Sequence, residues 1–143
     1  MLKLQEFINL HENWEELLSQ KPYALSIKRD VGYVLFAYNM IDSDFSNPIV
    51  QEARGIILDE LTMNPVCIPF FKFFNVQEGH AADIDWSTAT VTEKLDGSII
   101  KLWNDAGAWH ISTNGKSCFP CERTRSQYLS KAARFVAVPF PGK

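Results

Sequence analysis

The sequence contains no run of about 20 consecutive apolar residues, the length that a membrane-spanning helix needs. Its first residues, from Met1 to Glu6, lack the apolar stretch and the small-residue cleavage site of a signal peptide. Cysteine occurs three times in 143 residues, and an odd number this small gives no disulfide framework. We therefore expect a protein of the reducing cytoplasm with no membrane partner.

The composition is that of a globular domain, because 46% of the residues are hydrophobic and 13% are aromatic. Charge is unevenly distributed: residues 1–90 carry a net charge of −7, and residues 91–143 carry +4. This basic excess is compatible with a phosphate-bearing ligand, and an ordinary solvated surface explains it equally well. Cys118 and Cys121 have a redox-type spacing, but the βαβ context and the four ligands of a structural zinc site are missing, which favours reduced structural thiols.

The pattern of apolar residues predicts an α+β fold with antiparallel sheet and flanking helices, in a single domain spanning 1–143. A first helix is expected from Leu4 to Lys21, and residues 42–48 read as a polar loop with a turn at Asn47-Pro48. A second helix is expected from Glu122 to about Val136. The expected strands are 23–28 and 33–38 as a hairpin, then 55–58, 66–71, 88–93, 99–103 and 109–113.

Lys94 is the candidate nucleophile, in the segment Glu93-Lys94-Leu95-Asp96-Gly97-Ser98. A lysine attacks only when it is neutral, and its ordinary pKa near ~10.4 leaves about 0.1% neutral at pH 7.4. Nearby cations and partial desolvation must therefore lower the pKa of a nucleophilic lysine. Asp96 offers an acceptor beside it, and Gly97 lets the backbone approach a ligand closely. A surface hairpin can also produce the four-residue pattern K-x-D-G by chance.

Two upstream blocks add cations. Arg54 stands at the mouth of the apolar strand in Gln51-Glu52-Ala53-Arg54-Gly55-Ile56, and Lys72 lies within the aromatic run Pro69-Phe70-Phe71-Lys72-Phe73-Phe74-Asn75. Taken alone, the second block favours core packing with a snorkelling lysine. Together, the two cations are suited to flank a triphosphate.

In their order and spacing, these three blocks resemble the ATP-dependent RNA ligases, particularly the phage-type single-strand RNA ligase used in tRNA repair. The resemblance extends from about Leu4 to Ser117 and implies the N-terminal part of a nucleotidyltransferase core. DNA ligases and mRNA capping enzymes share K-x-D-G, but they usually carry an arginine two residues after the glycine. Here Gly97 is followed by Ser98-Ile99, as in RNA ligases.

The resemblance implies a role for each matching residue. Lys94 would take AMP from ATP, with Mg²⁺, as a lysyl-AMP, and pass it to an RNA 5′-phosphate that a 3′-hydroxyl then attacks; tRNA is one candidate substrate. Arg54 and Lys72 would contact ATP. Tyr38, in Ala37-Tyr38-Asn39, matches a nucleotide contact, and Glu93 matches a position near the adenine. For Tyr38 and Glu93, a packed strand tyrosine and a solvated glutamate remain alternatives.

The chain departs from the family pattern in two places. In Ser112-Thr113-Asn114-Gly115-Lys116-Ser117, where the family often has basic residues before the glycine, Lys116 is the nearest cation and the weakest candidate. No Glu-Gly pair follows Gly97, and no Lys-x-Lys occurs anywhere, so the later motifs for metal-assisted chemistry and phosphate contacts are absent. Two interpretations follow: a C-terminally incomplete part of a ligase, with no metal ligands assigned, or a non-catalytic nucleotide- or RNA-binding module that is truncated or depends on a partner.

Overall fold

The computed structural model describes residues 1–94, 97, 99–118 and 136–137, and it contains two four-stranded sheets with three short helices. The helices are α1 (Lys3–Leu10), α2 (Trp14–Ser19) and α3 (Pro48–Glu52). The first sheet has the order β1 (Ser26–Asp30), β2 (Tyr33–Ala37), β3 (Arg54–Asp59), β4 (Pro65–Cys67). The second has the order β7 (Ser117–Cys118), β6 (Ala108–Thr113), β5 (Ile100–Asp105), β8 (Val136–Ala137). Every strand pairing is antiparallel except that of β5 with β8. The α+β expectation with antiparallel sheet is thus confirmed.

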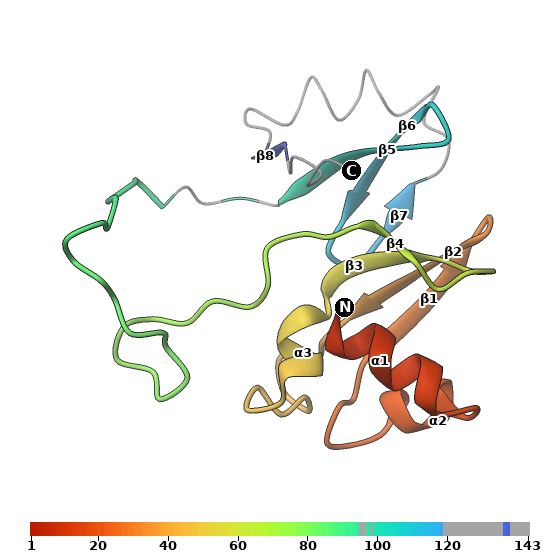
Figure 1. Cartoon of the computed structure of the whole chain (residues 1–143), viewed down its shortest axis with the longest axis horizontal. Coiled ribbons are helices and arrows are strands. Elements are labelled where there is room, and N and C mark those ends of the chain that lie inside the picture. The colour runs from red at the N-terminus through yellow and green to blue at the C-terminus, as the bar shows by residue number, and fades with distance from the viewer. Residues whose placement is uncertain (95–96, 98, 119–135, 138–143) are drawn as a thin grey trace.

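The central strands of the first sheet, β2 and β3, are buried on both faces, whereas β1 at its edge is largely exposed. Along β2, Val34 and Phe36 belong to one core cluster, whereas Leu35 belongs to another. Successive side chains of a strand point to opposite faces, so a run of buried apolar residues requires a cover on each side. In Figure 1 the three helices lie on one side of this sheet and the second sheet lies on the other. The two clusters fill those two interfaces.

The hairpin between β1 and β2 turns at Val31-Gly32, within the four residues 29–32 that separate the two expected strands. Asp30 pairs with Tyr33, which leaves a two-residue loop with φ of 42° at Val31 and 84° at Gly32. Positive φ at both loop residues is the geometry whose twist matches that of the flanking strands. The expected hairpin is therefore confirmed, although its strands begin and end up to three residues from the expected bounds.

Four expectations about secondary structure need correction. The first helix is split into α1 and α2 at residues 11–13. Residues 88–93 form no strand, and β4 ends at Cys67 rather than at residue 71. Asn47-Pro48 begins α3 instead of ending a loop: the Asn47 side chain accepts a hydrogen bond from the Ile49 amide, and Pro48 occupies the first turn. Proline has no amide hydrogen to leave unpaired there, so the pair is a helix start. The helix expected over 122–136 lies outside the described residues.

Glu52 joins α3 to the start of α1. Its buried carboxylate accepts hydrogen bonds from the backbone amides of Lys3 at 3.0 Å and Leu4 at 2.9 Å. The first amides of a helix have no partner within the helix, and a carboxylate is a strong acceptor for them. Glu52, two residues before Arg54, therefore has a structural role at the start of α1 that requires no ligand.

We expect Glu52→Gln to lower the free energy of unfolding by about 1–3 kcal/mol, because an amide nitrogen would then face one of the two helix amides. Urea denaturation measures the change, with Glu12→Gln, which removes an exposed carboxylate, as the matched control. Equal unfolding midpoints for the two variants would show that the carboxylate does not stabilise the start of α1.

Candidate functional site

Tyr38, Arg54 and Lys72, which lie in three separate parts of the sequence, are brought together at one end of the first sheet. Ala37 pairs with Arg54 across β2 and β3, and the Tyr38 amide donates to the Ala53 carbonyl at 2.7 Å. The Lys72 amide donates to the carbonyl of Gln51 at 2.8 Å, which ties the aromatic run to the end of α3. Backbone contacts therefore fix the positions of all three residues.

Aromatic rings surround the Lys72 ammonium. Its Nζ lies 5.3 Å from the ring centroid of Phe45 and 5.1 Å from that of Phe74. The Phe45 ring also packs edge-on against Tyr38, with centroids 5.0 Å apart. Cation–π contacts at a partly exposed site contribute about 0.5–1 kcal/mol each, so they hold the ammonium in place yet are weak enough for a phosphate to compete.

Arg54 is anchored to the same aromatic run. Its Nη1 donates to the Phe71 carbonyl at 3.3 Å, and its guanidinium carbon lies 4.3 Å from the ring centroid of Phe73. Its Nε is buried and has no hydrogen-bond acceptor among the described residues. A buried donor without an acceptor is costly, and such groups often mark a place where an ion or ligand belongs. The arrangement leaves the guanidinium with donor capacity for an anion.

The aromatic run is not the core segment that its apolar composition favours. Phe70, Phe71 and Phe73 are 53%, 43% and 59% exposed, and only Phe74 among the phenylalanines of the run is half-buried. Lys72 is thus not a lysine that extends out of a packed interior. The packing interpretation of this block is wrong for three of its four phenylalanines.

The second sheet docks on the first sheet beside Arg54. The buried Lys101 of β5 donates from its ammonium to the Gly55 carbonyl, and the Asn114 backbone approaches the same glycine. A Cβ at Gly55 would lie 2.5 Å from Lys101 Nζ and 2.7 Å from Asn114 Cα, and the φ of +80° also favours glycine. The close contact of the two sheets explains this glycine, and it places the block from Ser112 to Ser117 next to Arg54.

The candidate nucleophile has a different environment. Glu93, Lys94 and Gly97 lie exposed on the segment from 68 to 99, whose described residues form neither helix nor strand. Figure 1 shows this segment leaving the end of β4, running out from the two sheets and returning to β5. Gly97 has φ of 140°, a conformation that favours glycine. Within the described residues, Lys94 thus belongs to no helix or strand, whereas Arg54 lies in β3. Asp96 lies outside the described residues.

Lys116 is exposed at the turn between β6 and β7. Its carbonyl accepts from the Thr113 amide at 2.8 Å, and the neighbouring Gly115 carbonyl accepts from Lys28 Nζ at 2.6 Å. The turn is thereby held against β1. The Lys116 ammonium is accessible to a ligand. The contact between this turn and the neighbourhood of Arg54 is made by the Asn114 backbone at Gly55 and not by the Lys116 side chain.

Phe45 and Lys101 are two residues of this region that the sequence patterns did not identify. Phe45 follows a run of polar residues, and only its ring contacts with Tyr38 and Lys72 reveal its place. Burial lowers the pKa of Lys101 to about 8, although a coulombic interaction with Cys67 opposes the shift. Burial likewise raises the pKa of the Cys67 thiol to about 11, which makes this buried cysteine an unreactive thiol.

The described residues were compared with the requirements of a metal site and of a membrane-spanning helix. These residues contain no group of three or more His, Cys, Asp or Glu side chains that could hold a metal ion. They also include no helix with the length and hydropathy for crossing a membrane.

Comparison with known proteins relates the chain to RNA ligases. It is 34% identical over 90 residues to a protein of Autographa californica nuclear polyhedrosis virus named bifunctional polynucleotide kinase/RNA ligase. The match covers 56% of this chain, which spans only 13% of the length of that relative. No protein-family model matches the chain. The match supports a relationship to RNA ligases.

We expect a pH-dependent stability difference between the wild-type chain and Lys101→Met. The pKa of Lys101 in the folded chain lies below its ordinary value of 10.5, so between about pH 8 and pH 10.5 the unfolded chain binds more protons than the folded chain. The free energy of unfolding of the wild type therefore rises with pH in this range. Relative to the variant, its free energy of unfolding should increase by about 1 kcal/mol from pH 7 to pH 9.

Chemical denaturation of both proteins at several pH values measures this difference. The Cys67 thiol, whose raised pKa acts in the opposite direction, is present in both proteins and largely cancels. Parallel stability curves would contradict a buried, destabilised ammonium at Lys101.

Proposed function

We propose that the chain is the nucleotide-accepting part of an RNA ligase, in which Lys94 forms a covalent lysyl-AMP from ATP. The observation that carries the proposal is the meeting of Tyr38, Arg54 and Lys72 from three separate sequence blocks, with the Ser112–Ser117 block against Gly55. The relationship to a protein named for RNA ligase activity supports it.

In the proposed reaction, Arg54 and Lys72 bind the triphosphate and offset the charge that grows on it. Lys94 loses a proton to solvent, and its neutral amine then attacks the α-phosphorus. A nitrogen–phosphorus bond forms, and the bond to the bridging oxygen of the leaving pyrophosphate breaks. The AMP would next pass to an RNA 5′-phosphate, and attack by a 3′-hydroxyl would release it.

The described residues do not fit a resident magnesium site, because they offer no cluster of carboxylates. Magnesium in nucleotide sites commonly keeps several waters and is held partly by the phosphates of the substrate. The ion therefore enters this proposal only as the partner of ATP in solution, and no step depends on its ligands.

The exposed position of Lys94 favours a second candidate function. Arg54 lies in β3, and Lys72 is held at the same end of the sheet by the Gln51 carbonyl and the rings of Phe45 and Phe74. Lys94 lies exposed, further along the segment without regular structure that also carries Lys72. A chain of this kind would bind a nucleotide or RNA without reacting, or would react only when a further part of the protein closes over the segment.

We expect the intact mass of the chain to increase by one AMP after incubation with ATP and Mg²⁺. Lys94→Arg should abolish the gain, because arginine stays protonated and cannot attack. Lys3→Arg, at an exposed lysine of α1, is the matched control and should keep the adduct. A folded wild-type chain that binds ATP without gaining mass would support the binding module instead, and an adduct on Lys94→Arg would remove Lys94 from its role.

We expect Lys72→Met to slow adenylylation by roughly 10- to 100-fold, the loss of one charge-assisted contact to a phosphate. Methionine keeps apolar contact with the rings of Phe45 and Phe74, so stability should change little. The rate of AMP gain at subsaturating ATP measures the effect. An unchanged rate would mean that Lys72 serves packing alone.

A further inference from the structure

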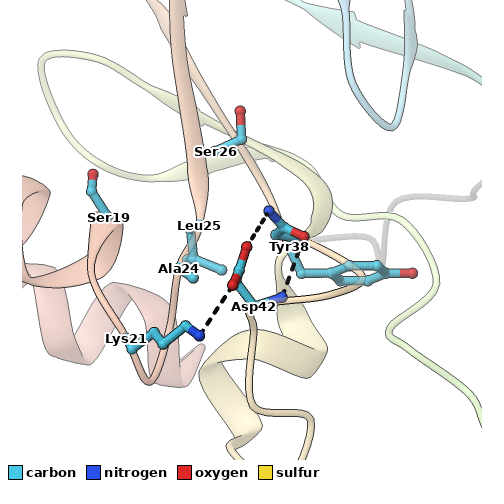
Figure 2. A pocket seen from close by; sticks show the side chains of 8 residues that line it. Ser19, Lys21, Ala24, Leu25, Ser26, Tyr38 and Asp42 are labelled. Carbon is cyan, nitrogen blue, oxygen red and sulfur yellow. Dashed lines mark hydrogen bonds and ion pairs between the residues drawn. The ribbon is translucent and has the colours of Figure 1, made fainter.

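A pocket of about 570 Å³ is lined in part by Tyr38. The end of α2, the start of β1 and the loop after β2 form its walls, and the side chains that matter here are those of Lys21, Ser26, Tyr38, Asn39 and Asp42. In Figure 2, Lys21 and Asp42 point toward each other, whereas the Tyr38 ring points away from them. The volume is in the range of small-molecule sites.

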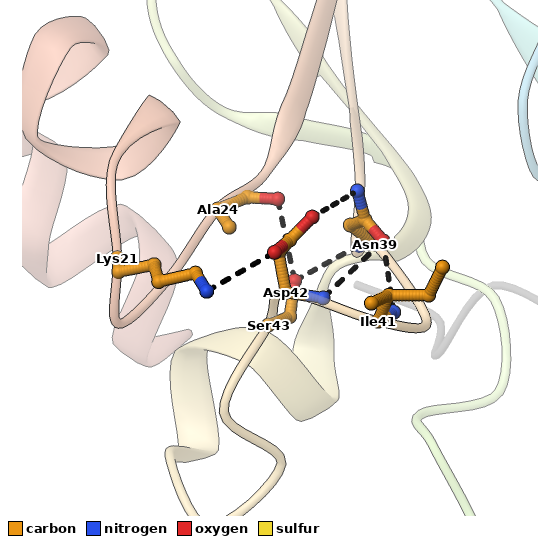
Figure 3. Close-up of polar contacts among 6 residues, drawn as sticks. All are labelled: Lys21, Ala24, Asn39, Ile41, Asp42 and Ser43. Carbon is orange, nitrogen blue, oxygen red and sulfur yellow. Dashed lines mark hydrogen bonds and ion pairs between the residues drawn. The ribbon is translucent and has the colours of Figure 1, made fainter.

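The loop that carries Asn39 and Asp42 is held in one shape by its own hydrogen bonds (Figure 3). The Asn39 side-chain oxygen accepts from the backbone amides of Ile41 at 2.8 Å and Asp42 at 3.3 Å. The buried hydroxyl of Ser43 accepts from the Asn39 amide at 2.9 Å and donates to the Ala24 carbonyl at 3.3 Å. These contacts fix the direction of the Asp42 side chain before any ligand arrives.

The Asp42 carboxylate keeps free acceptor capacity. It accepts from Lys21 Nζ at 3.1 Å through one oxygen and from Asn39 Nδ2 at 3.2 Å through the other. A carboxylate has about four lone-pair sites, so roughly two remain for a ligand. The Lys21 ammonium has three donors, and this ion pair engages one of them. The two groups together offer acceptors and donors on a nearly neutral surface.

This combination suits a hydroxylated ligand that carries a phosphate beside its hydroxyl. A free anion would gain little, because the Asp42 charge offsets that of Lys21. A ribose 2′-hydroxyl can donate to the carboxylate, while the adjacent phosphodiester accepts from Lys21. Tyr38 lines this pocket, and its ring packs against Phe45, which contacts Lys72, so the pocket lies next to the proposed nucleotide site.

We propose that this pocket binds one ribonucleotide of the RNA substrate, with Asp42 accepting from the 2′-hydroxyl and Lys21 contacting the neighbouring phosphate. The inference rests on the proposed ligase function, which supplies RNA as the partner. The 2′-hydroxyl is the group by which a protein distinguishes RNA from DNA at a given position. The pocket would therefore make the chain select RNA over DNA.

The test measures binding of fluorescent 5′-phosphorylated single strands to the full chain by anisotropy, with RNA and DNA of one sequence. The wild-type chain should bind RNA about tenfold more tightly than DNA, as expected for one hydrogen bond to a charged acceptor. Asp42→Asn should lower this ratio, because the neutral amide oxygen is a weaker acceptor than the carboxylate. Glu16→Gln, at an exposed carboxylate of α2 outside the lining of the pocket, is the matched control and should leave the ratio unchanged.

Lys21→Gln should act differently from Asp42→Asn. It should weaken RNA and DNA binding by the same factor and reduce the slope of log affinity against log salt by nearly one. Circular dichroism verifies that each variant is folded. The wild-type arm requires no variant, so the proposal stays testable even if Asp42→Asn fails to fold.

A wild-type chain that binds both strands equally, or binds neither, would overturn the proposal, as would a folded Asp42→Asn variant that keeps its preference for RNA. Adenylylation of Lys94 is measured without RNA, which separates the two claims. A chain that gains AMP but shows no preference for RNA loses only this inference. A chain that selects RNA but never gains AMP loses the proposed ligase reaction.

Discussion

The close approach of the two sheets at Gly55 is the constraint on which the arrangement of the site depends. The ammonium of Lys101 and the backbone of Asn114 occupy the space that a side chain would need at this position. The contact has a cost, since burial disfavours the charge on Lys101. It also brings the second sheet against the residue next to Arg54. The glycine of this block thus has a structural reason that is independent of any ligand.

The contacts around the first sheet organise the remaining candidate residues. The Glu52 carboxylate joins α3 to the start of α1. Just after α3, the pairing of β2 with β3 fixes the backbone at Arg54. The aromatic run returns to this end of the sheet, where Lys72 and Arg54 are held by rings and carbonyls rather than by carboxylates. Cations without an acidic partner among their described contacts are suited to an anionic ligand.

The sequence predicted β2 and β3 well because both faces of these two strands are apolar, whereas β1 begins three residues later and β4 ends four residues earlier than expected. It also predicted that Tyr38, Arg54 and Lys72 matter together, and the structure places them together. Their roles stay predictions. Local patterns could not reveal Phe45 or Lys101, because both are defined by contacts with residues far away in the chain.

The strand expected at 88–93 was wrong for a related reason. Alternation of residue types favours a strand, but a strand also needs a neighbour to pair with, and none of the described residues provides one there. The start of α3 is a different case. Asn47 and Pro48 carry a capping signal that the turn interpretation of Asn-Pro overlooked.

We propose that the end of the first sheet around Arg54 and Lys72 binds the phosphates of ATP. Titration of the isotope-labelled chain with a non-hydrolysable ATP analogue, followed by amide resonances in NMR, tests it most directly. The largest shifts are expected at the amides of Tyr38, Gly55 and Lys72. Saturable binding that moves other amides and leaves these three unchanged would contradict it.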